Sequence, residues 1–222
     1  MSVIVEIIMP AYNCEKTIKK SVDSILNQTY TNWELYIVDD GSTDKTNDII
    51  SSYNDPRIKA IRKINGGVSS ARNTALSQIT GNGFIAYCDA DDVWYPDHLN
   101  IAVTILCNTD YDIVYSNPRC IDEDGNQVFP SFPVYYKFDI DNLRKDNFIW
   151  ISTVVHKGFL GKFDSMVDSL EDYDLWIRAA KQGKKFSQSE AITCEYLVIP
   201  NGMAAKGKGA RKRLQVKHLD FI

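Results

Sequence analysis

The sequence predicts one α/β domain in which a mostly parallel sheet lies between two layers of helices. The chain has 222 residues, which favours a single domain at about 100–200 residues per domain. Hydrophobic residues make up 44% and charged residues 24% of the chain, a composition typical of a globular protein with a packed core. Apolar runs alternate with segments of helical periodicity, and this alternation is typical of parallel sheets.

The alternation is clearest in the N-terminal part of the chain. Short apolar runs predict strands at 3–9, 33–38, 57–62 and 84–88. Apolar residues spaced three and four positions apart predict helices at 15–28, 44–53 and 68–79. Pro10 is expected to end the first strand.

The alternation weakens after Pro96. We expect a helix at 97–107, a strand at 112–116, a turn at Asp124-Gly125 and a helix at 171–182. The segment 129–150 is dense in aromatic residues and contains two prolines. It fits an ordinary packing segment, which is the commoner case, or a wall that contacts an extended, partly apolar ligand.

Charge and targeting features narrow the function classes. The net charge of −4 gives no general reason to expect nucleic acid as a partner. Five cysteines without C-x-x-C spacing argue against a disulfide framework and a zinc site. The N-terminal apolar run has no basic region before it and is interrupted by Glu6, and no run reaches the ~18 apolar residues of a membrane span. We therefore expect a cytoplasmic protein, with peripheral attachment to the inner face of the membrane left open.

Polar residues gather where the predicted strands end. Pro10 to Asn13 follow the first strand, Asp39 and Asp40 follow the second, and Asp89-Ala90-Asp91-Asp92 follows the fourth. In parallel sheets the ligand crevice lies beyond the carboxyl ends of the strands. We therefore expect these three loops to converge on one edge of the sheet.

The Asp89-Ala90-Asp91-Asp92 cluster predicts a divalent cation. Carboxylates packed together repel one another unless a cation lies among them, and oxygen ligands suit Mg²⁺ or Mn²⁺. The alternative is an acidic turn before the next helix, since Asp is common in turns.

Glu171-Asp172 begins the last predicted helix. Acidic residues in a first helical turn are favoured by the helix dipole without any chemistry. Beside a metal cluster, however, they also fit a transferase, which needs a separate carboxylate base for the incoming hydroxyl.

Three basic features have both structural and functional explanations. Arg72 is expected on the exposed side of its helix, after Gly66-Gly67, and a lone arginine there is usually a solvated charge. The segment 202–209 nearly fits a phosphate-binding loop but ends in Gly209 in place of Ser or Thr. A basic stretch fits a solvated tail, with anionic lipid or pyrophosphate as functional alternatives, and comprises Lys206, Lys208, Arg211, Lys212, Arg213 and Lys217.

Five motifs in order closely resemble family 2 glycosyltransferases. They are Pro10-Ala11-Tyr12-Asn13, Val38-Asp39-Asp40-Gly41-Ser42, Asn65-Gly66-Gly67 with Ala71-Arg72-Asn73, Asp89-Ala90-Asp91-Asp92, and Glu171-Asp172-Tyr173-Asp174-Leu175-Trp176. The resemblance implies a GT-A fold, a Rossmann-like three-layer α/β/α arrangement in one domain. It implies a nucleotide-sugar-binding half at 1–95 and an acceptor-binding half at 96–200, with a basic tail at 201–222.

The resemblance also implies a role for each site residue. Pro10, Ala11 and Tyr12 would lie against the base, Asp39 would accept from the uracil N–H, and Arg72, Asp89 and Ala90 would bind the nucleotide, with Asp89 at the ribose. Asp91 would ligate Mn²⁺ or Mg²⁺ at the diphosphate. Asp172 would be the general base, with Glu171 beside it. Many relatives carry a histidine after the last strand, which Tyr196 to Met203 lack; a Lys or Arg of the tail is our hypothesis for the diphosphate contact.

The implied function is an inverting transfer of a hexose-type sugar from a nucleotide diphosphate, with UDP favoured, to a hydroxyl of a glycan or lipid-linked acceptor. Two alternatives share part of the pattern. A non-catalytic sugar-nucleotide-binding subunit would have every nucleotide motif, and an aspartyl phosphatase would use Asp89 as nucleophile after its strand.

Overall fold

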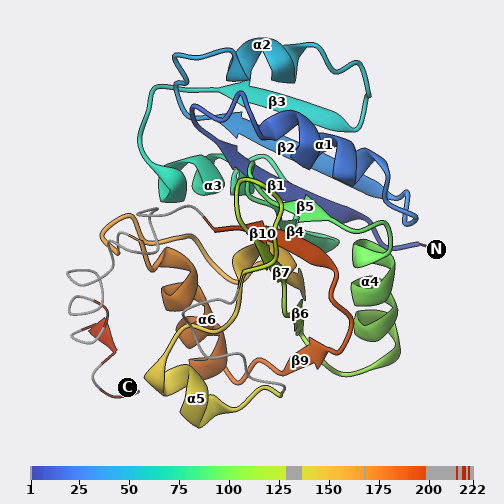
Figure 1. Cartoon of the computed structure of the whole chain (residues 1–222). Coiled ribbons are helices and arrows are strands. Elements are labelled where there is room, and N and C mark those ends of the chain that lie inside the picture. Colours follow the sequence, from blue (N-terminus) through green and yellow to red (C-terminus); the bar gives the residue numbers. More distant parts are fainter. Residues whose placement is uncertain are drawn as a thin grey trace.

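The computed structural model describes residues 2–128, 137–167, 169–198, and residues 214, 217, 218 and 220. Its centre is a seven-stranded sheet with the strand order β3-β2-β1-β4-β8-β6-β9 (Figure 1). These strands are β1 (Val5–Ala11), β2 (Trp33–Asp39), β3 (Ile58–Arg62), β4 (Phe84–Tyr87), β6 (Ile113–Ser116), β8 (Val155–Lys157) and β9 (Phe186–Ser189). All neighbouring pairs are parallel except the two made by β8, which confirms a mostly parallel sheet.

Helices cover both faces of the sheet. They are α1 (Ile18–Leu26), α2 (Thr46–Ser51), α3 (Val68–Leu76), α4 (His98–Asn108), α5 (Ile140–Lys145) and α6 (Glu171–Lys181). Successive residues of β1 point to opposite faces: Ile7 packs in one hydrophobic cluster with residues of α1, α2 and α4, and Ile8 in another with residues of α3, α5 and α6. The sheet is therefore buried on both sides, as parallel sheets are.

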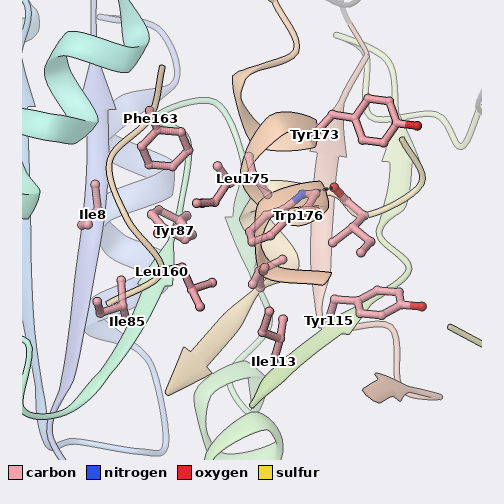
Figure 2. Packing of buried hydrophobic residues seen from close by; sticks show 14 of the residues in the cluster. Ile8, Ile85, Tyr87, Ile113, Tyr115, Leu160, Phe163, Tyr173, Leu175 and Trp176 are labelled. Carbon is pink, nitrogen blue, oxygen red and sulfur yellow. Dashed lines mark hydrogen bonds between the residues drawn. The ribbon is translucent and has the colours of Figure 1, made fainter. Parts of the chain in front are cut away.

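The cluster on the α6 face is built around aromatic side chains (Figure 2). The Tyr87 ring meets Phe163 edge-on at 5.5 Å between centroids and Trp176 at 6.4 Å. Trp176 also donates from its indole N–H to the Ile149 carbonyl at 3.2 Å. These contacts fix α6 against β4, the strand that leads into the acidic cluster.

The first strand runs through Pro10 to Ala11, two residues further than the sequence predicted. The Ile8 carbonyl accepts from Cys88 N on the β4 side, and the Ala11 carbonyl accepts from Asp40 N on the β2 side. Pro10 therefore faces the β4 side, but the pairing with β4 ends at Ile8. Its missing N–H costs no sheet hydrogen bond there.

Several short elements were not predicted. They are the antiparallel strand β8, strand β9, helix α5, the 3₁₀ turn at Ile151–Thr153, and the strands β5 (Val93–Trp94) and β7 (Arg119–Ile121), which form a second sheet with β10 (Cys194–Leu197). β8 pairs with β4 and β6, and β9 pairs with β6, so contacts distant in sequence place these strands. The expected turn at Asp124-Gly125 is present, with Gly125 at φ +82°.

Helices α1, α2, α3 and α6 are shorter than their apolar spacing predicted, whereas α4 has the predicted length. α1 begins at Ile18 because the Cys14 carbonyl accepts from the N–H groups of both Thr17 and Ile18, which forms a turn before the helix. All five cysteines are free, and Cys107 is exposed. Among the described residues, no helix combines the length and the apolar character that crossing a bilayer requires.

Residues near the C-terminus bind α6, among them Lys217 and His218. Lys217 Nζ lies 2.6 Å from Asp174 Oδ1 and 2.8 Å from Asp164 Oδ2, and His218 Nε2 lies 2.9 Å from Asp174 Oδ1. Burial raises the pKa of Asp174, but hydrogen bonds from Lys217, His218 and Arg178 outweigh it and lower the pKa below the ordinary value. Lys217 is therefore an ion-pair partner within the fold. The remaining basic residues of the tail, and the segment 202–209, lie outside the described residues.

We predict that Trp176→Ala will lower the free energy of unfolding by about 3–5 kcal/mol, because it opens a cavity beside Tyr87. Urea denaturation followed by circular dichroism measures the change. Ile64→Ala is the control, since Ile64 is 92% exposed and its loss should alter stability by less than about 0.5 kcal/mol. Equal stability of Trp176→Ala and the parent chain would contradict the packing described here.

Candidate active site

The loops after β1 and β2 interlock at the carboxyl edge of the sheet. Asn13 N donates to Ser42 Oγ at 3.0 Å, and Thr43 N donates to Asn13 Oδ1 at 2.8 Å. Asn13 adopts a positive φ of 47°, which asparagine tolerates better than most residues. Tyr12, just before it, is 53% exposed, whereas Ala11 is buried. The first predicted loop therefore presents an aromatic ring at this edge.

Asp39 and Asp40 are both buried but have different partners. Asp39 Oδ1 accepts from Ser42 N at 2.9 Å, while its Oδ2 has no hydrogen-bond partner among the described residues and lies 3.3 Å from Arg62 Nε. Asp40 accepts from the backbone N–H groups of Gly66 and Gly67 and from Lys63 Nζ. Asp40 therefore shapes the loop before α3, and Asp39 keeps an oxygen available for a donor.

Arg72 is buried, so the prediction that it lies on the exposed side of its helix was wrong. It is 2% exposed, and its guanidinium lies 5.2 Å from the Phe163 ring centroid. Its Nη1 donates to Glu171 Oε1 and its Nη2 to Asp89 Oδ1, each at 2.7 Å. Burial lowers the pKa of Arg72, but the carboxylates of Asp89 and Glu171 outweigh it and raise the pKa above its ordinary value. The small residues beside Arg72 on α3 were a signal of a buried helix face, but its acidic partners lie on other segments and left no local signal.

The first turn of α6 brings Asp172 next to this ion-paired cluster. Asp172 Oδ1 accepts from Tyr173 N at 2.7 Å, and Oδ2 accepts from Asn147 Nδ2 at 3.0 Å. Burial and the charge of Glu171 raise the pKa of Asp172 to about 7, although Arg72 and these hydrogen bonds act in the opposite direction. A carboxylate with a pKa near neutral pH suits general-base chemistry.

The acidic cluster after β4 is partly enclosed. Burial and the charge of Asp89 raise the pKa of Asp91 to about 6. Burial and the charges of Asp91 and Asp89 raise the pKa of Asp92 well above its ordinary value. Asp92 Oδ2 has no hydrogen-bond partner among the described residues. A cation beside these groups would offset the repulsion.

These residues fit a hard divalent cation that is held together with a substrate. Within the described ranges, no three His, Cys, Asp or Glu side chains converge as a complete set of protein ligands. Mg²⁺ usually takes only one or two carboxylates and completes its shell with substrate phosphates and water. The half-buried Asp91 carboxylate matches such a partial site.

Tyr196 and Ser152 belong to this site, although the sequence analysis gave neither a role. Burial raises the pKa of Tyr196 above its ordinary value, and four nearby carboxylates raise it further: Asp92, Asp89, Asp91 and Asp172. The Tyr196 ring packs on Trp150 at 4.5 Å, and Ser152 Oγ accepts from Asp89 N at 3.0 Å. The carboxylates of Asp91 and Asp172, which are 81 positions apart in sequence, therefore both raise the pKa of the same phenol. No local motif could have indicated this proximity.

Arg72→Leu is predicted to destabilise the protein by about 3–5 kcal/mol, because it leaves the buried Glu171 carboxylate and the nearby Asp89 without their cation. Urea denaturation at neutral pH measures it. Lys19→Ala is the control: the Lys19–Asp23 pair is exposed, and its loss should cost less than about 1 kcal/mol. An Arg72→Leu variant as stable as the parent would refute a structural role for this ion-paired cluster.

Solved structures show the same fold. The TarS 1-349 structure from S. aureus in complex with UDP-GlcNAc superimposes with a TM-score of 0.79 at 21% identity, over 98% of this chain and 67% of that chain. The mannosyltransferase PcManGT from Pyrobaculum calidifontis, in complex with GDP-Man and Mn²⁺, gives 0.72 at 21% identity, over 97% of this chain and 63% of that one. The fold is therefore GT-A, as the sequence predicted.

Sequence comparison shows the family. The chain is 35% identical over 216 residues to the UDP-Glc:alpha-D-GlcNAc-diphosphoundecaprenol beta-1,3-glucosyltransferase WfgD of Escherichia coli, covering 96% of this chain and 83% of the relative. It is 29% identical to the hyaluronan synthase of Pasteurella multocida, covering 95% of this chain but only 22% of that synthase. The model of Glycosyl transferase family 2 matches residues 6–167. On this match and the identity to WfgD, the chain belongs to glycosyl transferase family 2.

Proposed function

We propose that the chain is an inverting glycosyltransferase that uses Asp172 to deprotonate an acceptor hydroxyl. One observation carries the proposal: Arg72 joins Asp89, in the acidic loop after β4, to Glu171, the neighbour of Asp172. A carboxylate with a pKa of about 7 is thereby held beside a cluster suited to a diphosphate and its cation. An inactive binding subunit would not need a carboxylate of raised pKa there.

We propose a UDP-sugar as the donor. Asp39 Oδ2, which pairs with Arg62 but accepts no hydrogen bond among the described residues, and the exposed ring of Tyr12 lie in adjoining loops, where they suit a uracil N–H and the face of a base. WfgD is named for UDP-Glc, and the TarS structure holds UDP-GlcNAc, which supports this choice over GDP. UDP-glucose is the first donor to test, because WfgD covers nearly the whole chain.

Asp91 would hold a divalent cation, Mn²⁺ or Mg²⁺, together with the donor diphosphate. When bound, the cation would neutralise charge on the departing nucleoside diphosphate. Asp89 would contact the ribose, with Ala11 and Ala90 giving the nucleotide a close, uncharged surface. Arg72 keeps Asp89 and Glu171 in place, which leaves Asp172 to take the proton.

The reaction would be a single displacement. The acceptor oxygen forms a bond to C1 of the donor sugar as the bond from C1 to the diphosphate oxygen breaks, and Asp172 receives the hydroxyl proton. UDP-glucose is α-linked, so the β product in the name of WfgD requires inversion, which supports the same course here. Holding both reactants in line supplies much of the rate acceleration.

The acceptor class follows from the same relative. We propose an α-linked N-acetylglucosaminyl diphospholipid, since WfgD is named for that acceptor. In this proposal the chain works as one domain, with residues 1–95 binding the donor and 96–200 the acceptor. Peripheral membrane contact through the basic tail remains a prediction from the sequence.

Asp172→Asn is predicted to abolish transfer while leaving nucleotide binding within about twofold of the parent. In the parent, kcat/KM should rise about tenfold per pH unit below pH 7 and level off above it, because only the ionised base is active. Transfer from UDP-glucose, followed by chromatography of the product, and calorimetric binding of UDP test both points.

Stability provides the control for this variant. The folded pKa of Asp172 lies above its unfolded value, so ionisation disfavours the folded state and the contribution of Asp172 to stability falls between about pH 4 and pH 7. Asn cannot ionise. The variant should therefore be at least as stable as the parent at pH 8, and full activity of Asp172→Asn would overturn its role as base.

A nucleotide panel should identify the donor. With Mn²⁺ present, UDP-glucose at 100 times its Kd should add about 2.7 kcal/mol to the stability of the folded chain, while GDP-mannose at the same concentration should add little. Thermal unfolding measures the shift, and chelation of the cation should reduce it. Stronger protection by GDP-mannose would contradict the UDP assignment.

A further inference from the structure

We propose that Asn147 is the positioning residue of the base: its side-chain amide fixes the Asp172 carboxylate and favours its ionised form. This inference rests on the proposed role of Asp172. The contact is direct, since Asn147 Nδ2 donates to Asp172 Oδ2 at 3.0 Å. Asp172 Oδ1 accepts from Tyr173 N at 2.7 Å, so each carboxylate oxygen has one donor among the described residues. A carboxylate oxygen accepts two hydrogen bonds, which leaves room for an acceptor hydroxyl.

The other end of the Asn147 amide supports a functional role. Its Oδ1 is buried and has no hydrogen-bond partner in the part of the chain that the structure describes. A buried, unpaired acceptor destabilises a fold by about 1–3 kcal/mol, and buried polar groups are normally satisfied. An asparagine present only to stabilise this turn would satisfy both ends. Its one described side-chain hydrogen bond goes to Asp172.

The backbone around Asn147 is fastened to the helix that carries the base. On one side, the Tyr173 hydroxyl donates to the Leu143 carbonyl. On the other side, the Trp176 indole N–H donates to the Ile149 carbonyl at 3.2 Å. Because Tyr173 and Trp176 both belong to α6, the segment between Leu143 and Ile149 and the first turn of α6 form one unit. Asn147 therefore keeps its position relative to Asp172.

The charges around Asp172 do not by themselves favour its ionised form, so a neutral hydrogen-bond donor can contribute. Glu171, on the same helix, opposes ionisation, as burial does. Arg72 of α3 favours ionisation but is already bonded to Asp89 and Glu171. Burial and neighbouring carboxylates, Asp172 among them, raise the pKa of Tyr196 on β10. A hydrogen bond to the charged form of a carboxylate favours that form, and Asn147 supplies it without adding a charge.

The test compares two variants with a control. Asn147→Ala removes the donor, and Asn147→Asp keeps the shape but replaces the donor with an acceptor. Asn142→Ala is the matched control, because Asn142 lies on α5 and none of its described side-chain atoms bonds to Asp172. The carboxyl ¹³C resonance of Asp172, assigned by its absence in Asp172→Asn, is titrated in each intact protein. This measurement does not depend on the identity of the acceptor.

We expect Asp172 to titrate about one to two pH units higher in both Asn147 variants than in the parent, as loss of a hydrogen bond to a charged group implies. Asn142→Ala should match the parent. With UDP-glucose and a synthetic α-N-acetylglucosaminyl diphosphate bearing an undecyl chain, the acid limb of kcat/KM should move by the same amount, with little change in Kd for UDP.

An unchanged titration of Asp172 in Asn147→Ala and Asn147→Asp would overturn the inference, whatever happens to activity. Failure of the proposed function gives a different result, because Asp172→Asn would then retain transfer while the two Asn147 variants still shift the titration.

Discussion

The ion pairs of Arg72 are the constraint on which the rest of the site depends. One guanidinium on α3 holds Asp89, after β4, and Glu171, at the start of α6, each at 2.7 Å. Arg72 thereby joins its own helix to residues that lie 17 and 99 positions further along the chain. A buried cation between two carboxylates is tolerated only while all three remain in place. The position of Asp172 relative to the acidic loop follows from that requirement.

Periodicity predicted the first four strands and the helices between them, because apolar runs and amphipathic helices leave clear patterns in sequence. β8 is different: its three residues pair antiparallel between β4 and β6, a position set by contacts distant in sequence. The same holds for β10, which joins the acidic loop through the bond from Leu197 N to Asp92 Oδ1 at 3.3 Å. Such elements have too few residues to carry a pattern.

For the site, the sequence indicated which loops meet but not how their side chains are used. The carboxyl-end rule for parallel strands correctly placed Asp39 and Asp91 at one edge. It could not distinguish Asp39, whose Oδ2 accepts no hydrogen bond among the described residues, from Asp40, whose oxygens accept from the N–H groups of Gly66 and Gly67. The prediction that Arg72 is exposed was wrong, because helical spacing alone does not reveal partners on other segments. Asn147 lies in a stretch without any motif.

The polar contacts of Asp174 limit where the C-terminal part of this chain can be truncated. Asp174 is fully buried on α6, the helix that begins with Glu171 and Asp172, and two of its three described side-chain partners, Lys217 and His218, come from near the C-terminus. Truncation before Lys217 would leave the buried Asp174 carboxylate with Arg178 as its remaining described partner. Lys217 and His218, though more than 40 positions from Asp174 in sequence, therefore hold the helix that carries Asp172 in place.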